Sequence, residues 1–123
     1  MSRITRKWIG AFGTATVLAG QIWIAPLAVA ADGNMLEQGK EIAFDRKKGN
    51  CLACHMIEGG TAPGNIAPPL IAMKGRYPNK NDLRKQIYDP TVKNPETSMP
   101  PFGKHGILSE AELDRVVEFI WSL

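Results

Sequence analysis

The chain has 123 residues, with 15 Lys and Arg against 12 Asp and Glu and a formal net charge of +3. All of the excess positive charge lies near the N-terminus, at Arg3, Arg6 and Lys7, because no acidic residue precedes Asp32. Residues 31–123 are therefore balanced in charge, which excludes the basic surface that nucleic-acid-binding proteins need. They are also enough for only one small domain, with little room for a large hydrophobic core.

Residues 1–30 are expected to be a cleaved secretory signal peptide. The three basic residues are followed by an apolar stretch at 8–24 and then by the run Ala28-Val29-Ala30-Ala31, which holds the A-x-A pattern that signal peptidase reads. Cleavage after Ala30 leaves a mature domain at 31–123, and cleavage after Ala31 is the alternative site; either predicts a periplasmic location without a stable membrane span. The alternative is an uncleaved membrane anchor, since residues 8–31 are long enough to cross a bilayer.

A first helix is predicted over residues 35–48. Its apolar positions are Leu36, Ile42 and Ala43, with Phe44 adding to the buried side. Gly49 and Asn50 are expected to end it.

The next five residues, C-L-A-C-H at 51–55, form the attachment signature of a c-type haem. The Cys51 and Cys54 thiols would add across the two haem vinyl groups, and His55 would be the proximal ligand of the iron. The alternatives are a thioredoxin-like redox pair or half of a zinc site. A zinc site needs two further ligands, and His105 is the only other Cys or His in the chain. A redox pair should open a helix in a βαβ unit, for which the sequence gives no pattern. We therefore expect one covalent haem c.

The loop after the motif, at 59–69, is rich in Gly, Pro and Asn and is expected to wrap the haem edge. A ligating histidine normally donates its second ring N–H to a carbonyl or similar group. Pro68 stands where such a carbonyl could be supplied, so we predict a hydrogen bond from His55 to the Pro68 carbonyl.

Two further helices are predicted. A short one covers 82–88, with Asn81 as its N-cap and Pro90 preventing its extension. The last begins after Ser109, which forms a capping box with Glu112. Its apolar stripe consists of Leu113, Val116, Val117, Ile120 and Trp121. No segment shows strand alternation, so the predicted fold class is all-α with ordered loops.

The sixth iron ligand is predicted to be Met99, in the irregular stretch 90–106. Two prolines follow Met99 and stiffen the backbone, and Phe102 is suited to packing on the haem. A thioether is a weak ligand and needs a rigid loop to hold it. An iron with both axial positions filled favours electron transfer; a small peroxidase, which would need an open position, is a further alternative.

The other candidates for this ligand are His105, Met35, Met56 and Met73. His105, the second choice, is expected to be an exposed loop residue. Met56 follows His55 directly and cannot reach the opposite face of the haem. Met73 is expected to pack in the core, and Met35 to be a core or exposed residue.

The order of helix, C-x-x-C-H, Pro-Leu loop, Met-Pro loop and final helix resembles a class I cytochrome c over the whole mature chain. A narrower resemblance is to the SoxX family, the small monohaem subunits of the SoxAX cytochromes of bacterial sulfur oxidation. Four segments carry it, 49–55, 64–70, 83–91 and 94–105, and the series D-P-T, N-P and M-P-P-F-G is its most specific part. Ala67 stands where that family more often has glycine.

The resemblance implies an electron-transfer subunit of a complex that joins thiosulfate oxidatively to a carrier-protein cysteine. The implied partners are a SoxA-like haem subunit, a SoxYZ-like carrier and a small acceptor cytochrome c. The haem motif uses the only two cysteines, so the sulfur chemistry would occur on a partner. The alternative is a free-standing, diffusible periplasmic electron carrier, which needs the same haem site.

Overall fold

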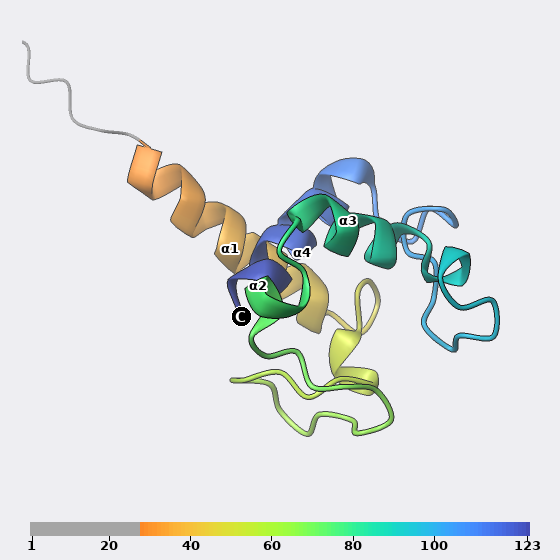
Figure 1. Cartoon of the computed structure of the whole chain (residues 1–123). Helices are drawn as coiled ribbons and strands as arrows, with labels where there is room; N and C mark the ends of the chain where they lie inside the picture. The colour runs from red at the N-terminus through yellow and green to blue at the C-terminus, as the bar shows by residue number, and fades with distance from the viewer. Residues whose placement is uncertain (1–27) are drawn as a thin grey trace, which may run out of the picture.

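The computed structural model describes residues 28–123, and four α-helices and two short 3-10 helices order this part of the chain (Figure 1). In chain order they are α1 (Ala28–Phe44), η1 (Cys51–Ala53), α2 (Met73–Arg76), α3 (Lys80–Tyr88), η2 (Pro90–Val92) and α4 (Glu110–Ser122). Between residues 28 and 123 there is no β-strand, which confirms the all-α fold class. None of the helices in the same range is both long and apolar enough to cross a membrane.

Helix α4 forms the centre of the domain and packs against α1, α2 and α3. Its predicted stripe is the heart of the core, because Leu113, Val116, Val117 and Ile120 are all buried. Buried residues from the rest of the domain complete the hydrophobic core, namely Ala43, Ile57, Leu70, Met73, Leu83, Ile87, Phe102 and Leu108. The capping box is present, with the Ser109 side chain accepting from Glu112 N and the Glu112 carboxylate accepting from Ser109 N. The predictions for this helix are confirmed except at two positions, since Trp121 is only partly buried and Phe119, which was not predicted to be in the stripe, is buried.

Helix α1 crosses α4 at Gly39. A Cβ on this residue would lie 2.0 Å from Arg115 O, so the missing side chain is what lets the two backbones approach. Near the crossing the Phe44 and Phe119 rings meet edge to face, with 5.9 Å between centroids. This contact fixes the end of α1, and therefore the start of the haem motif, against the last helix.

The bounds of α1 differ from the prediction at both ends. The helix ends at Phe44 instead of residue 48, because the Asp45 carboxylate accepts from Lys47 N and turns the chain. Gly49 N then donates a hydrogen bond to Ile42 O. Asn50, rather than Gly49, has the left-handed conformation, with φ 46°. At the other end α1 begins at Ala28, so it includes the predicted cleavage site after Ala30. Residues 1–27 of the predicted signal peptide lie outside the described residues.

Helix α3 is also longer than predicted and has a different cap. Asn79, in an extended conformation, accepts from Asn81 N, so Asn79 and not Asn81 is the N-cap. Pro90 ends the helix region as predicted and becomes the first residue of η2. The sequence did not predict η1, η2 or the four-residue helix α2.

Candidate haem attachment site

The C-x-x-C-H segment forms a compact turn at the end of α1. Cys54 N and His55 N both donate to Cys51 O, at 3.2 and 2.9 Å, and Ala53 N donates to Asn50 O. Both cysteines are free and half-buried, and His55 is half-buried beside them. One turn therefore presents two thiols and an imidazole, which are the groups that covalent haem attachment needs.

The Cys51 thiol has a raised pKa, about 11. Burial is the main cause and the charge of Cys54 adds to it, while a hydrogen bond to the backbone acts in the opposite direction. Reactive cysteines of redox C-x-x-C pairs instead have lowered pKa values. Cys51 is thus a neutral thiol at neutral pH, unlike the nucleophile of a thioredoxin-like pair.

The His55 ring is oriented by the Pro68 carbonyl, with Nδ1 2.7 Å from Pro68 O. This contact was predicted from the sequence. The segment that supplies the carbonyl is paired with the motif by two backbone hydrogen bonds, Ala67 N to Cys54 O and Leu70 N to Met56 O. With Nδ1 donating its proton to the carbonyl, Nε2 carries the lone pair that a metal needs.

A further residue that the sequence analysis missed supports the same carbonyl segment. Arg76 Nη1 donates to Pro69 O at 2.8 Å and also lies 3.4 Å from Met73 Sδ. Pro69 follows directly on Pro68, so α2 fixes the backbone on which His55 depends. No local pattern could have indicated this, because α2 is too short to have periodicity.

Met99 lies on the other irregular stretch, after η2. Its side chain is half-buried and packs against the core, and Met99 N donates to Thr97 Oγ1 at 3.2 Å. Phe102 is buried three residues later. The structure thus brings His55 and Pro68 into contact and places Cys51 and Cys54 in the same turn, while Met99 lies on a separate loop between η2 and α4.

The environments of the other ligand candidates agree with the predictions. Met73 is 2% exposed and is a core residue, whereas Met56 is 53% and Met35 37% exposed. His105 is exposed.

These residues fit a covalent haem. The thiols are free, the imidazole has its second nitrogen engaged, and the thioether lies outside the motif turn. Apolar side chains on the loop after the motif are left uncovered, above all Ile66, which is 77% exposed although it lies between His55 and Pro68. A large apolar group beside the motif would cover such a side chain.

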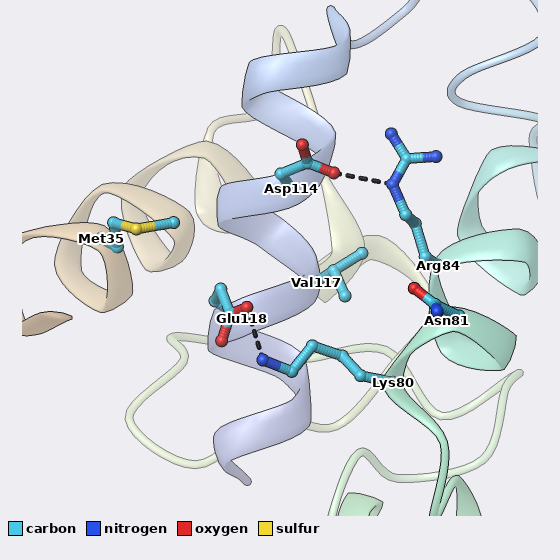
Figure 2. A pocket seen from close by; sticks show the side chains of 7 residues that line it. All are labelled: Met35, Lys80, Asn81, Arg84, Asp114, Val117 and Glu118. Atoms are coloured by element: carbon cyan, nitrogen blue, oxygen red, sulfur yellow. Dashed lines mark hydrogen bonds and ion pairs between the residues drawn. The ribbon is translucent and has the colours of Figure 1, made fainter.

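Two half-open surface pockets lie elsewhere among residues 28–123. The first, of about 340 Å³, lies between α3 and α4 with Met35 of α1 at its side (Figure 2). Its charged side chains neutralise one another, as Lys80 pairs with Glu118 and Arg84 with Asp114. The second, of about 420 Å³, lies beside α3 and η2. Neither pocket is lined by Cys51, Cys54, His55 or Met99.

Comparison with known proteins agrees with this site. The cytochrome c family model matches residues 36–123. A protein of Aquifex aeolicus (strain VF5), named an uncharacterized lipoprotein, is 35% identical over 75 residues, which are 60% of this chain. The chain spans only 36% of the length of that relative.

A solved structure gives the narrower comparison. A chain of the crystal structure of SoxXA from P. pantotrophus is similar with a TM-score of 0.63 and 28% identity, over 70% of this chain and 79% of that one. This similarity supports the resemblance to SoxX that was predicted from the sequence. The chain belongs to the cytochrome c family, with the class I fold, covalent haem c and an electron-transfer function.

Proposed function

We propose that this chain is the small electron-transfer subunit of a SoxAX-like complex, which joins thiosulfate to a cysteine of a SoxYZ-like carrier protein. The observation that carries the proposal is the structural similarity to SoxXA, with a TM-score of 0.63 over 79% of that chain. The resemblance of residues 83–91 and 94–105 to SoxX supports it, since generic cytochromes c share only the Met-Pro part of these segments.

In this proposal each residue of the site has one role. Cys51 and Cys54 would hold the haem covalently and His55 would ligate its iron, while the Pro68 carbonyl fixes the orientation of the imidazole. Met99 would supply a thioether as the second protein ligand of the iron and so would exclude water and peroxide from it. When bound, the haem supplies a one-electron couple, and a thioether ligand raises its reduction potential relative to two histidines.

The conjugation itself needs a partner. Forming the S–S bond between a cysteine thiol and thiosulfate yields the cysteine S-thiosulfonate, one proton and two electrons. One haem accepts one electron, so a second redox centre is required, which a SoxA-like haem subunit would provide. Both thiols of this chain are used by the haem, so the bond forms outside it. A small acceptor cytochrome c would then receive the electrons.

The proposed location is the periplasm, reached by means of the signal peptide at residues 1–30. Covalent haem attachment takes place outside the bacterial cytoplasm, which agrees with export. An uncleaved N-terminal anchor remains the alternative to cleavage after Ala30 or Ala31.

Co-purification tests the proposal. The full-length chain is expressed with a c-type haem maturation system and a SoxA-like subunit from the same genome, and is isolated through a C-terminal tag. We expect a heterodimer whose haem is reduced when thiosulfate and the carrier are added together. A carrier with its cysteine replaced by serine is the control and should give no reduction. A monomer that binds no haem subunit would support the diffusible carrier instead.

A further inference from the structure

The two ends of the loop that carries Met99 are joined by hydrogen bonds to a single carbonyl oxygen, that of Tyr88. Tyr88 O accepts from both Gly103 N and Lys104 N, each at 3.1 Å, so the last residue of α3 lies against the far end of the loop. The contact is tight, because a Cβ on Gly103 would lie 2.0 Å from the Tyr88 ring. Residues 89–102 are thus closed at their neck into an Ω-loop with Met99 inside it.

Asp89 ties together the two ends of this loop. One carboxylate oxygen accepts from Thr91 N and Thr91 Oγ1, and the other accepts from Lys104 Nζ at 2.7 Å. The Asp89 side chain is 12% exposed, whereas that of Lys104 is 52% exposed. The hydrogen bonds from Lys104 and then Thr91 lower the Asp89 pKa, so the carboxylate is charged at neutral pH.

Within the loop, two polar side chains form successive turns that lead to Met99. Asn94 Oδ1 accepts from Glu96 N at 3.1 Å, and Thr97 Oγ1 accepts from Met99 N at 3.2 Å. Asp89, Asn94 and Thr97 all lie in the stretch 89–105, which carries the resemblance to SoxX beyond the Met-Pro element of generic cytochromes c. The structure therefore gives the segment a physical purpose, which is to order the backbone around Met99 by local hydrogen bonds.

We propose that Asp89 is a positioning residue for Met99, acting by closing the neck of the 89–102 loop through Thr91 and Lys104. The inference rests on the proposed role of Met99 as the axial ligand. A thioether binds iron weakly, so its occupancy depends on how little the loop opens. The side-chain hydrogen bonds of Asp89 go to Thr91 and Lys104, and not to Met99 or the haem motif, so its effect would be exerted through the loop ends.

The test is competition by imidazole for the ferric holoprotein, followed by loss of the sulfur-to-iron charge-transfer band. Imidazole binds only when the loop opens and Met99 leaves, so its apparent affinity reports the open population. We expect Asp89→Asn to bind imidazole about tenfold more tightly, because the charge-assisted hydrogen bond to Lys104 is lost and the hydrogen bonds from Thr91 N and Thr91 Oγ1 are weakened as well. Hydrogen exchange at the Thr91 and Lys104 amides should also become faster.

Two further variants separate positioning from general destabilisation. Asp82→Asn removes an exposed carboxylate that pairs with Lys85 on the same helix, and should leave imidazole affinity unchanged. Lys104→Met removes only the exposed partner of Asp89, and should raise the affinity by about two- to threefold. If Asp89→Asn fails to fold, the imidazole affinity of Lys104→Met tests the proposal in its place.

The outcomes distinguish this inference from the proposal beneath it. If the wild-type ferric protein lacks the charge-transfer band, Met99 is not a ligand of the iron, and the proposed role of Met99 is wrong. A wild-type protein that shows the band, together with Asp89→Asn or Lys104→Met variants whose imidazole affinity is unchanged, overturns the positioning role of Asp89 alone.

Discussion

The Nδ1 atom of His55 lies 2.7 Å from the carbonyl oxygen of Pro68, thirteen residues further along the chain. Because proline has no N–H, Pro68 cannot itself donate a backbone hydrogen bond. Its neighbours fix the backbone: Ala67 N and Leu70 N donate to the haem motif and the residue after it, and the Pro69 carbonyl accepts from Arg76. The orientation of the proposed proximal ligand is therefore built into the fold of the chain. The Met99 loop has a separate support, at Tyr88 and Asp89.

Replacing Met99 by alanine should abolish the sulfur-to-iron charge-transfer band of the ferric protein and lower its reduction potential. The reason is that a thioether favours ferrous iron more than the water or other ligand that would take its place. Visible absorption and a potentiometric titration check both effects.

Met56→Ala is the matched control for Met99→Ala. Met56 is 53% exposed and follows His55 directly, so its loss should leave the band in place. An unchanged spectrum in Met99→Ala would remove Met99 from the site.

The features that local sequence predicted correctly are those with local causes. The capping box of Ser109 and Glu112 involves residues three apart, and the stripe of α4 repeats with helical period. The C-x-x-C-H motif is contiguous, and the Pro68 contact follows from the need of a ligating histidine for a carbonyl. For the helix and the motif the interacting residues lie close together in the chain, whereas the Pro68 contact spans thirteen residues and was predicted from the chemistry of the histidine.

What the sequence could not predict depends on tertiary contacts or on the backbone conformation. Helix α2 is only four residues long, so no hydrophobic period reveals it or the role of Arg76. Asn79 and Asn81 are equally suitable caps by composition, and only the extended backbone of Asn79, at φ −100° and ψ 113°, makes it the cap. The pairing of Asp89 with Lys104 depends on a loop that closes on itself.

Replacing both Cys51 and Cys54 by serine should give an exported chain without covalent haem. The haem is expected to supply much of the apolar volume of this small domain, so the variant should also be largely unfolded. Haem staining after denaturing electrophoresis and far-UV circular dichroism measure the two effects. Each single variant keeps one thiol and serves as the control for partial attachment. Haem retained by the double variant would contradict the assignment.

Gly39→Ala should destabilise the domain by about 1–3 kcal/mol, because the new methyl group would overlap the α4 backbone at Arg115. Gly33→Ala, in the same helix, is the control. A Cβ there would meet nothing within 4 Å, so this variant should be neutral or more stable by about 0.5–1 kcal/mol. Chemical denaturation of the holoproteins measures both changes. Equal effects of the two substitutions would show that the close crossing of α1 and α4 does not limit stability.

The pairing of Glu112 with Lys48 predicts how stability responds to acid. Hydrogen bonds from the Lys48 ammonium, and then from Ser109, lower the Glu112 pKa from an ordinary 4.5 to about 2. Because the folded state lowers this pKa, the stabilisation is fully present above the unfolded-state value. It is lost as pH falls from about 4.5 to about 2. Glu112→Gln removes both the capping-box carboxylate and its charge.

At pH 6 the Glu112→Gln variant should be less stable than wild type by about 1 kcal/mol, and the difference should shrink at pH 3 and below. Denaturant midpoints at several pH values measure this, and Glu58→Gln, at an exposed position outside the capping box, is the control. If the difference in stability between the two proteins stayed constant from pH 6 to pH 2, the negative charge of Glu112 would not be its cause. The ion pair with Lys48 connects the segment before Cys51 to the start of α4, so the same measurement tests whether that connection stabilises the fold.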